Sequence, residues 1–196
     1  MQVLALLLAA ATASCDRGTT YDMRTCWNKQ SVAAAGELSS TYEKLLAELR
    51  KLGIDESPLV DAQSAWIGAR DTTCEFEYSL YLPGTIAPQL GLECAVRMTR
   101  ARTQRLEAIL DSLQDRVAKR PEEPVSPAVD AELNRVYKLY AARITPAQRT
   151  QLGTAEHVWI RYRDKACAFE GGSCPTDLEK ERTAELEASW VGEAFW

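Results

Sequence analysis

Apolar side chains recur at three- and four-residue spacing through most of the chain, a pattern typical of amphipathic helices packed on a core. In the first half, one such stripe covers residues 38–52 and ends at Gly53, a residue type favoured just after a helix. Ser57-Pro58 suits the start of a second helix, because proline is tolerated in the first turn. A third stripe covers residues 98–113 and completes a three-helix unit.

The second half follows the same scheme. Apolar stripes cover residues 133–140, 152–163 and 178–190, and no clear alternating strand pattern interrupts them. Before the middle stripe, Thr145-Pro146-Ala147-Gln148 has the form of a capping box, with proline at the first helical position. The sequence therefore predicts an all-α protein made of two tandem three-helix units.

One phrase occurs in both halves. Residues 66–77 and 159–170 match at seven of twelve positions without a gap and share W-I-x-x-R-D-x-x-C-x-F-E. The match extends outward, since Glu37-Leu38 returns as Glu132-Leu133, and Arg102-Thr103 returns as Arg182-Thr183. A chain that repeats two tryptophans, two Arg-Asp pairs and two cysteines in register indicates a tandem duplication of one structural unit.

The start of the chain predicts export. Residues 1–14 carry no charge, and their apolar run is too short to span a bilayer but fits a signal peptide with cleavage after Ala11-Thr12-Ala13. We therefore expect a periplasmic or secreted protein with no transmembrane segment. An alternative stays open, because Thr12-Ala13-Ser14-Cys15 loosely resembles a lipobox, in which Cys15 would carry a lipid anchor.

Prolines mark the boundary between the two units. Residues 120–127 contain three of them, which cannot continue a helix. We assign this segment as the linker, with the first unit at residues 15–119 and the second at residues 128–196.

Charge restricts the kind of partner. The chain has 23 basic and 28 acidic residues, a net charge of −5 and a pI near 5.1. It should therefore not bind nucleic acid through bulk electrostatics, and it should be drawn towards cationic proteins.

The six cysteines indicate disulfides, as expected for an exported chain. The duplication places the pair Cys74 and Cys94 where the second unit has Cys167 and Cys174, which leaves Cys15 to pair with Cys26. A metal site is disfavoured because His157 is the one histidine and no pair has Cys-x-x-Cys spacing. We expect no cofactor.

Four arginines interrupt the apolar stripes at repeated positions: Arg70, Arg102, Arg163 and Arg182. A charge on a buried stripe needs partners, and the repeat supplies four acidic residues: Glu37, Asp71, Glu132 and Asp164. We therefore predict a buried arginine–carboxylate lattice within each unit, tying its three helices together, so that Arg70→Leu destabilises the fold strongly. The alternative is an anion-binding site.

The segment between Cys74 and Cys94 is the candidate for partner binding. It displays aromatic and apolar side chains that a disulfide would hold in place, namely Tyr78, Tyr81, Leu82 and Thr85. The alternative interpretation is that these side chains cover the core. Catalysis has little support, because no nucleophile elbow, phosphate loop or zinc helix motif occurs.

Together the motifs resemble the LprI-like lysozyme inhibitor family of small exported helical domains with cysteines. The second unit carries the fuller set: Glu132-Leu133-Asn134, Ala155, Trp159, Arg163-Asp164, Cys167, Gly171-Gly172-Ser173, Cys174, Arg182-Thr183 and Leu186. The first unit adds Cys15-Asp16, Met23 and Cys26, but has Ser39 in place of the usual asparagine. The resemblance implies binding and inhibition of lysozyme. The alternative is a structural or adaptor module of the cell envelope that binds another protein.

Overall fold

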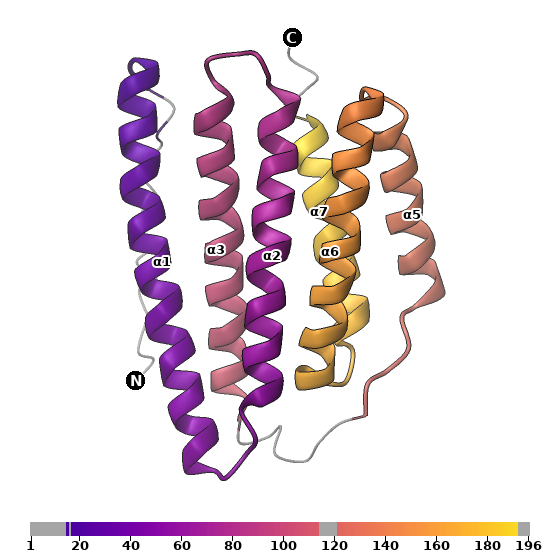
Figure 1. Cartoon of the computed structure of the whole chain (residues 1–196). Helices are drawn as coiled ribbons and strands as arrows, with labels where there is room; N and C mark the ends of the chain where they lie inside the picture. Colours follow the sequence, from indigo (N-terminus) through magenta and orange to yellow (C-terminus); the bar gives the residue numbers. More distant parts are fainter. Residues whose placement is uncertain (1–14, 16, 114–120, 192–196) are drawn as a thin grey trace, which may run out of the picture.

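The computed structural model describes residue 15, residues 17–113 and residues 121–191, and over these ranges the chain is all-α. The predicted signal peptide lies outside them. Figure 1 shows the helices, which are α1 (Thr20–Lys51), α2 (Ser57–Leu80), α3 (Ala87–Asp111), α5 (Pro127–Ala141), α6 (Pro146–Glu170) and α7 (Cys174–Val191). The all-α prediction is confirmed. Each half of the chain contributes three of these helices.

Local sequence signals set several helix ends. The capping box predicted at Thr145 is present, because its side chain accepts from the Gln148 backbone and Gln148 bonds back to the Thr145 N–H at 2.9 Å. Gly53, expected just after the first helix, follows α1 with φ of +67°, a conformation that favours glycine. α2 begins at Ser57, but the residue before it, Glu56, makes no side-chain cap.

α2 and α6, the helices that carry the repeated phrase, pack against each other along their length. Lys165 pairs with Asp61 at 3.0 Å near one end, and Gln148 donates to the Ser79 carbonyl at 3.3 Å near the other. The two helices are therefore antiparallel, as Figure 1 shows. Equivalent residues of two antiparallel helices are related by a local two-fold axis perpendicular to the plane of the pair. Such residues lie on the same face of the pair.

The remaining helices are arranged symmetrically about this pair. α3 packs on α2 and on α1, and α7 packs on α6 and on α5. In Figure 1, α1 and α5 form the two flanks of the molecule. One continuous hydrophobic core includes buried residues of both halves, with Trp66 and Trp159 only 3% and 4% exposed. The two copies thus share a core and stabilise each other.

Disulfides close the repeated helix pairs. The predicted bonds Cys74–Cys94, joining α2 to α3, and Cys167–Cys174, joining α6 to α7, are confirmed. A third bond joins Cys15 to Cys26 in α1. The segment before α5 is also attached, since Glu123 N–H donates to the Gly172 carbonyl at 2.9 Å. No described helix is long and apolar enough to cross a membrane.

Candidate functional site

Arg182 of α7 is the most buried charge among the repeated arginines. Its side chain is 0% exposed and pairs with Glu156 of α6 at 3.0 Å and with Glu185 of α7 at 2.8 Å. It also donates to Thr73 Oγ1 of α2 at 3.4 Å and lies over the Trp159 ring at 5.8 Å. One guanidinium therefore connects α7 with α6 and with α2 of the first half.

Arg102 of α3 occupies the equivalent position in the first half but has different partners. It donates to Gln63 Oε1 of α2 at 3.0 Å and to Tyr162 Oη of α6 at 3.2 Å. Gln63 stands where the second half has Glu156, and Arg105 stands where it has Glu185. No described carboxylate forms an ion pair with Arg102. Both halves thus have the buried arginine, but only the second half surrounds it with acids.

Arg70 and Arg163 share another geometry. Each lies over the tryptophan one turn earlier, at 5.1 Å for Trp66 and 5.8 Å for Trp159. Each donates from Nε and Nη2 to Oδ1 of the aspartate that follows it, Asp71 at 2.8 and 2.7 Å, and Asp164 at 3.0 and 2.9 Å. These aspartates are 60% and 61% exposed. Each half of the chain therefore presents at its surface one carboxylate that is paired with an arginine.

The predicted lattice needs correction on two points. Glu37 is exposed on α1, and no described ion pair joins it to these arginines. Glu132 pairs with Arg135 one turn along its own helix. Both glutamates lie on the solvent side of a first helix, whereas the arginines belong to second and third helices. The arginine contacts also cross between the halves, so the network ties the two units to each other and is not confined to one.

Glu179 of α7 is a buried acid that the repeat did not indicate, because the first half has Thr99 at its position. It is 1% exposed and accepts from Arg163 Nη1 at 2.7 Å, while its Oε2 is buried without a hydrogen-bond partner. Burial raises the pKa of Glu179, although Arg163 opposes this shift. The contact anchors α7 to α6 beneath the repeated phrase.

A groove of about 810 Å³ separates α3 from α7, with Trp66, Trp159 and Tyr162 at its floor. Its walls have opposite charge at equivalent positions, since Arg97 and Arg105 of α3 correspond to Asp177 and Glu185 of α7. Ion pairs cross it, from Arg97 to Glu185 at 3.2 Å and from Arg105 to Glu181 at 2.8 Å. Because of this complementarity, each half fits the other half better than it would fit a copy of itself.

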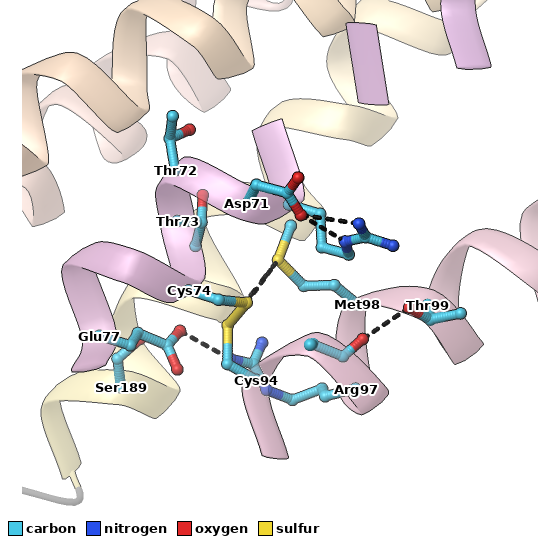
Figure 2. Close-up of a disulfide and its surroundings, with 12 residues drawn as sticks. Asp71, Thr72, Thr73, Cys74, Glu77, Cys94, Arg97, Met98, Thr99 and Ser189 are labelled. Atoms are coloured by element: carbon cyan, nitrogen blue, oxygen red, sulfur yellow. Dashed lines mark hydrogen bonds and ion pairs between the residues drawn. A yellow bond between two sulfur atoms is a disulfide. The ribbon is translucent and has the colours of Figure 1, made fainter. Parts of the chain in front are cut away.

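Figure 2 shows the Cys74–Cys94 disulfide that joins α2 to α3, with Arg97 and Met98 beside it. The Met98 sulfur lies 3.7 Å from Cys74 Sγ and 3.9 Å from Cys94 Sγ, and Glu77 pairs with Arg97 at 2.6 Å. Burial raises the pKa of the Glu77 carboxyl, and Arg97 opposes the shift. Within the described part of the chain, no group of three or more His, Cys, Asp or Glu side chains is placed to hold a metal ion.

Only part of the predicted partner-binding segment, Tyr78 to Thr85, lies in the loop between α2 and α3. Tyr78 belongs to the last turn of α2 and is half-buried, while Tyr81 follows the helix and is also half-buried. Leu82 is 52% exposed, and Thr85 is exposed near the start of α3. The loop therefore offers one large apolar side chain to solvent.

The comparisons with known proteins match this arrangement. The family model described as "Lysozyme inhibitor LprI" matches residues 11–106 and 126–186, which takes in both copies of the repeated phrase. The chain belongs to the LprI lysozyme inhibitor family. The two matched segments agree with a tandem arrangement of the LprI domain.

Two individual matches are to proteins described as uncharacterised. An uncharacterised protein of Rhizobium meliloti (strain 1021) is 32% identical over 105 residues, which cover 48% of this chain and 76% of that relative. The crystal structure of an uncharacterised Burkholderia thailandensis protein is similar in fold, with a TM-score of 0.67 at 20% identity over 90% of this chain and 91% of that one. The second match concerns the fold alone.

Part of the repeated phrase faces solvent. Ile67 and Ile160 directly follow the buried tryptophans and are 43% and 36% exposed. One residue corresponds to 100° of helical rotation, so each isoleucine lies outside the apolar stripe. We define the outer face as the exposed residues of α2 and α6 that surround them: Val60, Ser64, Ile67, Asp71, Glu75, His157, Ile160, Arg161 and Asp164. Plotting the repeat on a helical wheel would have found this face.

Proposed function

We propose that this protein is an exported inhibitor that binds a lysozyme-type glycosidase and blocks its action, with no catalytic role of its own. The observation that carries the proposal is the match of the LprI lysozyme inhibitor model to both halves of the chain. An inhibitor of this kind acts by occupying its target, so it needs a firm surface more than reactive groups.

Charge and rigidity support the proposal. A net charge of −5 would steer the protein towards a strongly basic lysozyme and speed their encounter at low salt. The shared core, the buried Arg182 network and the disulfides fix the helices before binding. A surface that is already ordered loses less conformational entropy on association, which favours affinity.

Export is part of the proposal. Three disulfides among six cysteines are typical of an oxidising compartment, and residues 1–14 have the composition of a signal peptide. Cys15 is bonded to Cys26 in this structure. A sulfur in a disulfide has no free valence for a lipid thioether, so the bridged and lipid-anchored forms exclude each other at Cys15. The mass of the mature N-terminal peptide distinguishes them.

A second candidate function is that of an envelope adaptor without inhibitory activity. The exposed Leu82 in the loop after α2 favours it, because an apolar side chain on a segment held by the Cys74–Cys94 bond suits recognition of another protein. An adaptor would bind its partner equally well in the presence of lysozyme.

The test is inhibition of cell-wall lysis by a C-type lysozyme. The oxidised protein from Ser14 onward is titrated against a fixed amount of enzyme at low and at physiological salt. We expect stoichiometric inhibition that weakens as salt rises, because screening removes the steering charge. A reduced and alkylated sample serves as the control for fold dependence. Unchanged lysis at a large molar excess of folded, bridged protein would leave the adaptor as the better proposal.

A further inference from the structure

Repeated residues that face solvent call for an explanation other than folding. Ile67 and Ile160 are retained in both halves, yet neither is buried among the described residues of the core. Isoleucine is also a weaker helix former than alanine or leucine, by about 0.4 kcal/mol at an exposed position. The fold therefore gains less from isoleucine at these two places than from the fully buried residues of the apolar stripes.

The local two-fold axis gathers these side chains into one patch. α2 and α6 approach closely where Gly68 meets Val158, since a Cβ placed on Gly68 would lie 3.4 Å from Val158 Cγ1. Ile67 directly precedes Gly68, and Ile160 lies two residues after Val158. Both isoleucines are thus within one helical turn of the crossing point, and the symmetry places them on the same side. Val60, 44% exposed, continues the apolar strip along α2.

Oriented carboxylates flank the patch. Arg70 binds Asp71 through Oδ1, and Arg163 binds Asp164 in the same way, so Oδ2 of each aspartate has no described partner and stays open to solvent. The arginines are recessed, at 26% and 23% exposed against about 60% for the aspartates. A carboxylate fixed in this manner loses little entropy when it accepts a bond from a partner.

The charge of the outer face favours a cationic partner. Asp71, Glu75 and Asp164 are exposed carboxylates, while Arg161 is the exposed cation among the residues that define the face. Lys165 and Asp61, at the rim, neutralise each other. Apolar anchors surrounded by oriented acceptors are the composition expected where an acidic protein holds a basic one.

We infer that the outer face of α2 and α6 is the surface through which this protein holds a basic lysozyme-type enzyme. Ile67 and Ile160 are its apolar anchors, and Asp71 and Asp164 accept bonds from cationic side chains of the enzyme. This inference rests on the proposed function. Because both copies contribute to one continuous patch, one chain binds one enzyme molecule.

Calorimetric titration of full-length mature protein with a C-type lysozyme tests the inference. In the Ile67→Gln/Ile160→Gln variant we expect roughly a hundredfold weaker affinity, about tenfold for each anchor. Val32→Gln/Leu139→Gln is the matched control, because it removes exposed aliphatic residues from α1 and α5, 75% and 38% exposed. The control should bind within about twofold of wild type, and both variants should melt with the wild-type protein.

A third variant separates the surfaces. Leu82→Gln alters the loop after α2 and should bind like wild type. If Leu82→Gln loses affinity and the isoleucine variant does not, the enzyme is bound at the loop, so the inference is wrong while the proposed function stands. If wild-type protein itself does not bind lysozyme, both are wrong. Asp71→Asn/Asp164→Asn should reduce the salt dependence of binding, and an unchanged salt slope would contradict the role of the aspartates.

Discussion

Replacing Arg182 with methionine isolates the charge network between the two halves. Methionine is close to arginine in length and apolar character, so the change removes the guanidinium while filling much of its space. Glu156 and Glu185 are only 16% and 14% exposed. Glu156 would lose its cation, and Glu185 would keep only the pair with Arg97 at 3.2 Å. Breaking a buried pair from one side leaves uncompensated charge and costs about 3–5 kcal/mol. For a chain of this size that is a fall in melting temperature of roughly 6–20 °C.

Two companion variants make the interpretation specific. Arg102→Met removes the equivalent guanidinium, whose hydrogen-bond partners Gln63 and Tyr162 are neutral, so its cost should be lower, about 1–3 kcal/mol. Arg135→Met removes an exposed pair with Glu132 and should cost less than about 1 kcal/mol. In Arg182→Met, changing the stranded Glu156 to glutamine should restore part of the lost stability.

The measurement is urea and thermal unfolding followed by circular dichroism at neutral pH. The expected order of destabilisation is Arg182→Met, then Arg102→Met, then Arg135→Met. An Arg182→Met protein that melts within about 2 °C of wild type would refute the reasoning, because the cost of a stranded buried charge would be absent.

Three other predictions follow from the same structure. Arg70→Leu should cost only about 1 kcal/mol in urea unfolding, because its partner Asp71 is 60% exposed; a loss of several kcal/mol would restore the stronger sequence-based expectation. Burial raises the folded-state pKa of Glu179 above 4.5, so wild-type stability falls as pH rises through the interval in which only the folded state keeps the proton. Glu179→Gln should therefore be at least as stable as wild type at pH 7, and the difference should disappear as both states of the wild-type carboxyl become protonated in acid; the opposite pH trend would contradict this. Removing Cys74–Cys94, with a separation of 20 residues, should cost roughly 1 kcal/mol more than removing Cys167–Cys174, with a separation of 7, and unfolding of the two double-alanine variants checks the order.

Much of the fold could be predicted because its determinants are local. Helical spacing of apolar residues, the Thr145 capping box and the proline-rich linker are all visible in one sequence, and the internal repeat added the cysteine pairing. Those features depend on residues close in the chain or on a comparison of the two halves.

The arginine partners could not be predicted for the opposite reason. Glu156 and Glu185 approach Arg182 only when α6 and α7 pack, and Thr73 approaches it only when the two halves meet. The repeat drew attention to Glu37 and Glu132, which are matched between the halves but lie on the solvent side of their helices. A shared position indicates a shared environment, and for these glutamates the shared environment is water.

The surface formed by the exposed isoleucines could also not be predicted from the sequence. They directly follow the buried tryptophans, and the helical period places them outside the apolar stripes of α2 and α6. Once the antiparallel packing is known, the two copies become one surface, and that depends on tertiary structure alone.

The most direct test of the account is the stoichiometry of binding between the oxidised mature protein and a C-type lysozyme, measured by isothermal titration calorimetry at low salt. The account predicts one enzyme molecule for each chain, with affinity that falls as salt is added. Two enzyme molecules for each chain would contradict a single surface shared by the two copies. No detectable binding by folded, bridged protein would contradict the lysozyme-inhibitor function itself.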